Sequence, residues 1–260
     1  MLFSFVYLAF FVLFGLVIGS FLNAAEYRLF QGESLLKNKN KTLAKSHCPH
    51  CQTVLKPQEL VPVFSFLFLK GRCRTCHQQI SWQYPAVELG SAVLFLWSAL
   101  VFVQVDQAIF VAIISAFLLF IFLYDLKHQL VLDVVTVPAI ILAGLGSIFV
   151  FQLSFLNLIL GALLGGGFFL AQYLISRGRW IGGGDIRLGI LMGVLLGWER
   201  TLLALMLAYI LGALIALILL IQKKAHANSR LAFGTFLTLS TFFSLLYGTQ
   251  LIDWYLKFLL

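Results

Sequence analysis

The chain has 260 residues, of which 61% are hydrophobic and only 11% are charged, and its formal net charge is +8 at pH 7. A soluble domain carries roughly 25% charged residues, so this composition excludes an ordinary soluble globular protein and predicts an integral membrane protein. In a membrane protein, basic cytoplasmic loops account for a positive net charge, and we therefore expect no nucleic-acid partner.

The amino-terminal apolar run predicts a membrane span that is retained in the mature protein. The first 25 residues contain no Lys or Arg, so the basic region that opens a cleavable signal peptide is missing. The run is also long for the apolar part of such a peptide. We expect residues 1–25 to form the first transmembrane helix, followed by a polar segment at 26–84.

Seven further apolar runs follow the polar segment, and most are close to the ~20 residues that cross a bilayer core. Together with the first run they predict a polytopic membrane protein with about eight transmembrane helices. The expected domains are the first helix (1–25), the polar region (26–84) and a membrane core (85–260). The eight runs lie at 3–24, 86–104, 108–124, 134–151, 156–176, 186–198, 201–221 and 231–252.

The basic residues indicate how these spans are oriented. With the amino terminus outside, each of the 18 Lys and Arg residues except Arg200 and Lys257 falls in a cytoplasmic loop or at an adjoining span end. An excess of Lys and Arg is typical of cytoplasmic loops. We therefore expect both termini to be external and the segment 26–84 to be cytoplasmic.

The polar segment contains four cysteines with the spacing of a metal site. They occur as two C-x-x-C pairs: Cys48, Cys51, Cys73 and Cys76. Each pair can bind from one tight turn, and four thiolates complete a tetrahedral zinc site with no open position for chemistry. We expect a structural zinc ion that folds this segment. The alternative, disulfides or a redox-active pair, is disfavoured by a cytoplasmic location. Three histidines are expected to flank the site without binding the metal: His47, His50 and His77.

The expected fold is thus an all-α polytopic membrane protein with a small cytoplasmic zinc-binding loop domain. Among its ten acidic residues, Asp125 and Asp185 lie where a charge is costly. Asp125 ends the apolar run FLLFIFLYD, and Asp185 opens another run after a glycine triplet in WIGGGDIRLG. The orientation above places both at the cytoplasmic face. A carboxylate at membrane depth costs about 2.5–3.5 kcal/mol on insertion scales and is a candidate for function.

Two facing carboxylates can carry out peptide hydrolysis without a metal. They cannot both ionise cheaply, so they share one proton. The ionised partner can activate water, and the protonated partner can polarise the carbonyl and then protonate the leaving amine. We therefore expect Asp125 and Asp185 to be catalytic. Glycines beside them leave backbone groups free to pair with an unwound substrate, so Gly182, Gly183 and Gly184 are candidates for substrate binding.

Simpler interpretations of the acidic residues remain open. Asp125 could be a helix-end charge that reaches water, and Asp185 could be a helix N-cap. Asp133 could cap the following helix. Glu26 and Glu88 are expected to be solvated charges at span ends, although Glu88 is also a candidate for substrate binding.

The chain resembles the prepilin peptidases, membrane aspartic peptidases that process type IV pilins and type II secretion pseudopilins. Four segments in the family's order carry the resemblance, which covers nearly the whole chain. They are GSFLNAAEYRL at 19–29, CPHC…GRCRTCHQQISWQYPAVEL at 48–89, YDLKHQLVLDVVTVP at 124–138 and GGGDIRLG at 182–189. Two details depart from the family: Val131 and Leu132 replace a common Ile-Pro, and prolines expected near Gly234 are missing.

The resemblance implies a function and its residues. Asp125 and Asp185 match the family's catalytic pair, and the four cysteines match its metal ligands. Family members remove a short basic leader from the precursor at the cytoplasmic face of the bacterial inner membrane, and many then N-methylate the new terminus. The implied cofactors are zinc and S-adenosylmethionine, and the implied partners are prepilin or pseudopilin precursors and the lipid bilayer.

Two other functions fit parts of the sequence. An ion-coupled transporter would also place acids near glycine breaks, although both acids here lie at one face and no inverted repeat is visible. A non-catalytic zinc-knuckle scaffold would explain the cysteines, but it gives Asp185 no purpose.

Overall fold

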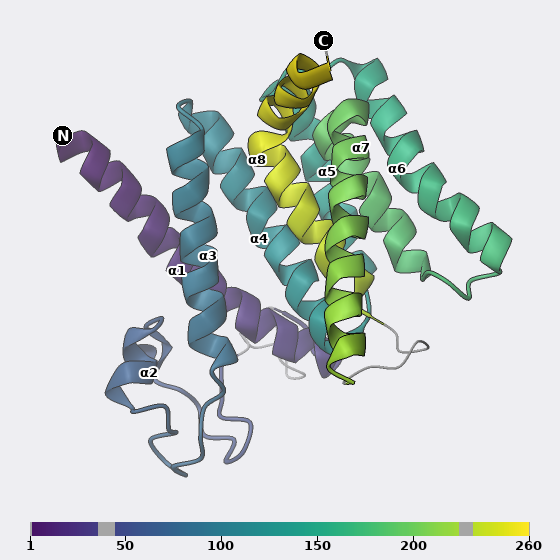
Figure 1. Ribbon diagram of the computed structural model, residues 1–260. Helices are drawn as coiled ribbons and strands as arrows, with labels where there is room; N and C mark the ends of the chain where they lie inside the picture. The colour runs from purple at the N-terminus through teal and green to yellow at the C-terminus, as the bar shows by residue number, and fades with distance from the viewer. Residues whose placement is uncertain (1, 36–44, 224–230, 260) are drawn as a thin grey trace. The chain divides into compact units, whose positions relative to one another are not determined.

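A computed structural model describes residues 2–35, 45–223 and 231–259. Some of the basic residues used to predict the orientation lie outside these ranges: Lys37, Lys39, Lys41, Lys224 and Arg230. The described residues form helices and loops without a β-strand, which confirms the predicted all-α class (Figure 1). The helices are α1 (Leu2–Phe30), η1 (Pro57–Leu60), α2 (Phe64–Phe68), α3 (Gln83–Val101), α4 (Val105–His128), α5 (Asp133–Phe149), α6 (Phe155–Ser176), α7 (Gly183–Ile221) and α8 (Phe233–Leu259).

Within the described part of the chain, six helices are long and apolar enough to cross a membrane, namely α1, α3, α4, α6, α7 and α8. α5 is a shorter apolar helix. These helices confirm the prediction of a polytopic membrane protein. α7 has 39 residues, and at 1.5 Å per residue such a helix would be about 58 Å long, nearly twice the thickness of a bilayer core.

α7 is not straight, because it reverses direction at Gly197. This residue has a non-helical backbone, with φ 73° and ψ 175°. Before it, Gly189 lies against Gly165 of α6, and just after it the Trp198 N–H donates to Asn157 at the start of α6. Further on, Tyr209 is hydrogen-bonded to Gln172 near the end of α6. The first arm of α7 is therefore antiparallel to α6, and the second arm runs parallel to it. The two arms correspond to the predicted spans 186–198 and 201–221.

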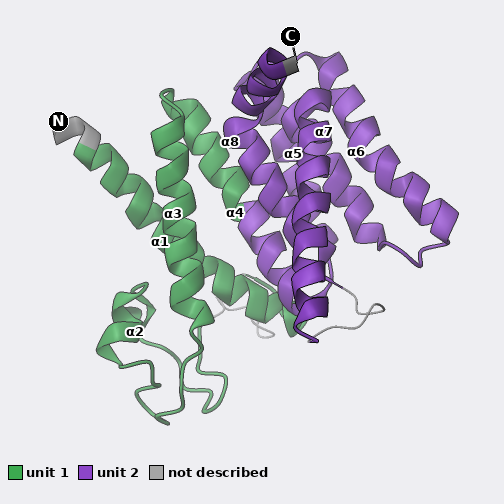
Figure 2. Cartoon of the chain, viewed as in Figure 1, with its two compact units in different colours: residues 1–116 green, residues 117–260 purple. Residues whose placement is uncertain are grey.

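The chain divides into two compact units, residues 1–116 and residues 117–260 (Figure 2). The first unit contains α1 to α3 and the beginning of α4, and the second contains the end of α4 and α5 to α8. The boundary therefore falls inside a helix. The division expected from the sequence, 1–25, 26–84 and 85–260, stays a prediction.

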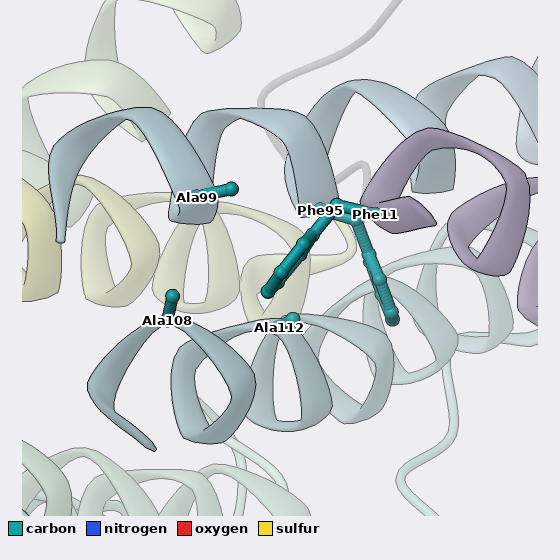
Figure 3. Packing of buried hydrophobic residues seen from close by; sticks show 5 residues of the cluster. All are labelled: Phe11, Phe95, Ala99, Ala108 and Ala112. Atoms are coloured by element: carbon teal, nitrogen blue, oxygen red, sulfur yellow. The ribbon is translucent and has the colours of Figure 1, made fainter. Parts of the chain in front are cut away.

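In the first unit, α1 and α3 are joined by small residues and aromatic rings. Gly15 and Gly19 of α1 have no room for a Cβ, which would lie 2.7 Å from the Cα of Ala92 and 2.6 Å from the Cα of Glu88. Such G-x-x-x-G spacing lets membrane helices approach closely. Beside this crossing, Phe11 and Phe95 pack against alanines of α3 and α4, Ala99, Ala108 and Ala112 (Figure 3).

In the second unit, α6 and the first arm of α7 touch through their backbones. Gly161 faces Gly193, and one turn further along α6 Gly165 faces Gly189. A Cβ on any of these glycines would collide with backbone atoms of the opposite helix. This contact fixes the first arm of α7, which begins at the predicted catalytic Asp185.

We predict that Gly161→Ala destabilises the protein by about 1–3 kcal/mol, because the clashing atoms belong to backbone that cannot rotate away. Gly167→Ala on the same helix is the matched control. A Cβ there meets nothing within 4 Å, so this substitution should be neutral or slightly stabilising. Denaturant unfolding of the two purified variants measures both effects. Equal stabilities would contradict the proposed close contact.

Candidate active site

Asp125 lies in the last turn of α4, where its side chain is buried and only 5% exposed. Its Oδ2 accepts a hydrogen bond of 3.0 Å from the backbone N–H of Thr235, the third residue of α8. The first N–H groups of a helix have no partner within the helix, and they carry its positive dipole end. The start of α8 therefore holds the Asp125 carboxylate in place.

Gly234 makes this arrangement possible. A Cβ at this position would lie 2.7 Å from Oδ2 of Asp125 and 3.0 Å from Cδ1 of Leu188. Only a residue without a side chain lets α8 approach the carboxylate so closely. The roles of Gly234 and Thr235 were not predicted from the sequence, because a glycine in LAFGTFL is the only local signal and the contact joins residues 110 positions apart.

Asp185 is the third residue of α7, and its side chain is 9% exposed. Its Oδ2 accepts a hydrogen bond of 3.0 Å from the backbone N–H of Gly182, which is the N-cap residue. Asp185 therefore caps α7 from the third position of the helix, as the acidic residue of a capping box does. It is not itself the N-cap residue. A capping role and a catalytic role are compatible, because the cap uses a single oxygen.

The two aspartates lie near each other in the second unit. A Cβ on Gly234 would touch both Asp125 and Leu188, which lies one turn beyond Asp185, so the two aspartates lie within range of an electrostatic interaction. The structure therefore brings together two carboxylates that are 60 positions apart in the sequence. In each of them Oδ2 accepts a backbone N–H, and the backbone of Gly234 is a second donor to the Asp125 carboxylate.

The glycine triplet has two different environments. Gly182 and Gly183 are exposed, and a Cβ on Gly183 would meet nothing within 4 Å. Gly184 instead packs against Val131, whose Cβ would lie 2.7 Å from an added Cβ. Gly184 is therefore explained by packing, and open space for an extended substrate occurs at Gly182 and Gly183. The role of the triplet in substrate binding stays a prediction.

Asp133 lies outside this pair. It is the first residue of α5, it is exposed, and it forms an ion pair with Arg187. Arg187 follows Asp185 by two positions, a spacing that does not place the two side chains face to face on a helix. The ion pair connects the beginnings of α5 and α7.

Two glutamates of the first unit contradict the sequence analysis. Glu26 and Glu88 are buried, so the expectation that they are solvated charges at span ends was wrong. Glu26 accepts a hydrogen bond from Gln83, and Glu88 accepts one of 2.7 Å from the backbone N–H of Val63. Both lie where α1 crosses α3, which brings side chains of the helix ends into the protein interior. The predicted role of Glu88 in substrate binding stays a prediction.

The four cysteines lie together in the first unit, on two turns of the same design. Their sulfur atoms are all within 4.8 Å of one another. The backbone carbonyls of Cys48 and Cys73 each accept a hydrogen bond from the N–H four residues later, at Gln52 and His77. Both of these later residues have positive φ. The sulfurs of Cys48 and Cys76 are 3.9 Å apart. Sulfurs of a tetrahedral zinc site with Zn–S bonds of about 2.3 Å lie about 3.8 Å apart, so the geometry fits zinc.

The four thiols influence one another's protonation. Hydrogen bonding with the hydroxyl and backbone of Thr53 lowers the pKa of Cys51 to about 6. A backbone hydrogen bond from Gln78 lowers the pKa of Cys76, but desolvation and hydrogen bonds with the neighbouring thiols together raise it to about 11. Four sulfurs this close cannot all be negative unless a cation compensates them. The donor set is that of a soft divalent metal ion.

Comparison with known proteins identifies the chain. Residues 13–102 match the description Bacterial Peptidase A24 N-terminal domain, and residues 112–217 match the Type IV leader peptidase family. The Prepilin leader peptidase/N-methyltransferase of Pseudomonas aeruginosa is 30% identical in an alignment that covers 95% of this chain and 92% of the relative. The chain belongs to the type IV leader peptidase family.

Other relatives of this leader peptidase extend the same similarity. Proteins named Prepilin leader peptidase/N-methyltransferase are 31% identical in Legionella pneumophila, covering 95% of this chain and 93% of the relative, and 30% identical in Bacillus subtilis, covering 94% and 96%. No solved structure gives a significant match. The amino-terminal match contains the four cysteines, and the peptidase match contains both aspartates.

We predict that Cys73→Ser abolishes zinc binding by the purified leader peptidase and lowers its thermal stability, since metal binding supplies folding free energy to such a segment. His77→Ala, next to the same turn, is the control and should retain about one zinc ion per chain, as expected for a four-cysteine site. Elemental analysis by mass spectrometry, together with thermal unfolding, gives both results. Full zinc content in Cys73→Ser would refute this assignment of the ligands.

Proposed function

We propose that Asp125 and Asp185 are the catalytic residues with which this leader peptidase removes the leader of prepilin or pseudopilin precursors. The observation that carries the proposal is the meeting of two buried carboxylates, each held by backbone N–H groups at the start of a helix. Burying two acids is expensive, and no basic side chain is needed to hold them. Stability alone gives no reason to keep such a pair.

The contacts of the two aspartates are compatible with a general acid–base mechanism. Oδ2 of each aspartate accepts a backbone N–H, and a carboxylate has further lone pairs with which it can bind water and substrate. The ionised carboxylate takes a proton from the water, whose oxygen attacks the carbonyl carbon of the scissile peptide. The protonated carboxylate donates to the carbonyl oxygen, and a proton finally passes to the leaving nitrogen as the C–N bond breaks.

Exposed backbone beside the pair supports binding of an extended substrate. Gly182 and Gly183 are exposed, and a Cβ on Gly183 would meet nothing within 4 Å, so a peptide strand can approach the backbone there. A helical precursor would have to unwind locally before its peptide bond reached Asp185. This requirement suits a cleavage site near the amino-terminal end of the precursor's apolar segment.

The charge distribution supports a cytoplasmic active site. The basic residues favour an orientation in the bacterial inner membrane with both termini external, and the zinc-binding segment and both aspartates then lie at the cytoplasmic face. The transporter and scaffold alternatives have no comparable support, because the chain belongs to a peptidase family.

We include structural zinc and a second activity, N-methylation of the new terminus, in the proposal. Cys48, Cys51, Cys73 and Cys76 would hold the zinc ion, and the ion would fold the segment around it. Methylation is supported by the names of the relatives. It would require S-adenosylmethionine, and none of the described contacts points to a residue that would bind it. No residue is therefore assigned to this cofactor.

We predict that Asp125→Asn and Asp185→Asn each lower the rate of leader removal by about a thousandfold or more, because neither amide can exchange the proton. Asp133→Asn is the matched control. It removes an exposed aspartate that is paired with Arg187, and it should retain most activity. Cleavage of a purified precursor, followed by mass spectrometry, measures all three. If either amide variant of the pair cleaves at the normal rate, the catalytic assignment fails.

We also predict that Gly234→Ala lowers kcat by about a hundredfold, because the added methyl group displaces the Asp125 carboxylate and small displacements of catalytic groups are costly. The matched control is Gly144→Ala, where a Cβ meets nothing within 4 Å. Steady-state cleavage assays separate kcat from KM. Unchanged kcat in a folded Gly234→Ala protein would show that α8 does not position Asp125.

A further inference from the structure

An apolar patch on the zinc-binding segment has no role in the chemistry above. It comprises four large side chains on α2 and just before α3, which we name the α2 patch: Phe64, Leu67, Phe68 and Trp82. All four are exposed, Phe68 to 84% and Trp82 to 75%. Exposed apolar side chains grouped in this way typically mark a surface that binds a membrane or a protein.

The α2 patch is held beside a membrane-spanning helix. The backbone N–H of Val63, directly before α2, donates to Glu88 in the second turn of α3. Phe66 of α2 is buried and packs on Trp82, with ring centroids 4.9 Å apart. α2 therefore lies against the first turns of α3, and α3 is a candidate membrane span.

The α2 patch also continues an apolar face of α3. Trp82, Leu89, Val93 and Leu100 are all exposed, and their spacings of seven, four and seven residues place them on one side of a helix. An exposed apolar face on a membrane-spanning helix contacts lipid. Trp82 stands at the end of this face, where tryptophans of membrane proteins are enriched at the boundary between lipid and water.

Positive charge borders the α2 patch. A cavity of about 370 Å³ adjoins it, and the lining residues include Phe66, Trp82, Lys70 and Arg72. No acidic residue is among the described residues that line it. A site with two cations beside apolar side chains complements a phospholipid, whose phosphate is negative and whose acyl chains are apolar.

We propose that the α2 patch inserts into the interfacial layer of the bilayer and that Lys70 and Arg72 bind the phosphate group of an anionic phospholipid. The lipid anchors the zinc-binding segment to the membrane surface. Gly71 connects this anchor to the zinc site. Its N–H donates to the Phe66 carbonyl of α2, and Gly71 itself lies two residues before Cys73. The inference depends on the membrane insertion of α3 and does not depend on peptidase activity.

The first test locates Trp82 in the full-length protein in phosphatidylcholine nanodiscs. The difference in fluorescence between the wild-type protein and Trp82→Phe isolates this residue, and phenylalanine preserves the ring contact with Phe66. We expect quenching by lipids spin-labelled near the headgroup and protection from aqueous acrylamide. The double variant Leu67→Gln/Phe68→Gln should weaken the lipid quenching, whereas Val54→Gln, an exposed apolar residue outside the patch, should not.

Two results would overturn insertion. Free access of acrylamide would place Trp82 in water, and protection from both quenchers would place it against another part of the protein.

The second test concerns the headgroup. Quenching of Trp82 by spin-labelled phosphatidylglycerol should exceed quenching by spin-labelled phosphatidylcholine, and Lys70→Gln/Arg72→Gln should abolish this preference. Lys45→Gln/Lys56→Gln removes the same charge from exposed sites in the same segment and should retain it. If both double variants lose the preference equally, or if the wild type shows none, there is no specific headgroup site.

Discussion

The second unit depends on how two carboxylates are kept buried by backbone donors, with no ion pair to either of them among the described residues. Each accepts an N–H from the start of a helix, Asp125 from α8 and Asp185 from its own α7. Hydrogen bonds to an ionised group are stronger than those between neutral groups, and they compensate part of the desolvation cost. Within the second unit, the end of α4 and the beginnings of α7 and α8 must therefore lie close together.

Close backbone contacts make this meeting possible. Glycines at four positions let α6 and the first arm of α7 touch, and Gly234 lets α8 reach Asp125. A further hydrogen bond, from the Ser147 hydroxyl to the Leu195 carbonyl, joins α5 to the same arm. In a membrane, packing and interhelical hydrogen bonds replace the hydrophobic effect as the force between helices. The glycines thus serve the active site indirectly, because they determine where helices begin and end.

In the first unit, the polar segment is too small to form a hydrophobic core of its own. Two turns with the same hydrogen bonds each present two thiols, and a metal ion can join them. The segment is also tied to the helix pair through Val63 and Glu88. Buried Asn23 donates to the Tyr84 carbonyl in the same region. Polar contacts therefore connect the thiol cluster to the packed helices.

Local signals allowed much of this protein to be predicted from its sequence. Apolar runs predicted the helices, and C-x-x-C spacing predicted the thiol cluster. The position of Asp185 after three glycines made it a candidate catalytic residue. The contacts of Gly234 with Asp125, and of Val63 with Glu88, could not be predicted, since each joins residues distant in the chain. Glu88 was misjudged for the same reason. Its position at a span end favoured water, but the neighbouring helix and loop enclose it.

The reversal of α7 at Gly197 has a consequence for the surrounding lipid. The first arm, from Gly183 to Leu196, is roughly 21 Å long at 1.5 Å per residue, whereas the hydrocarbon layer is about 30 Å thick. Such a mismatch is relieved by thinning of the adjacent bilayer or by entry of water at the short end. Asp185 lies at that end. A deformed, hydrated depression in the membrane would bring solvent to a residue that the flat leaflet would otherwise cover.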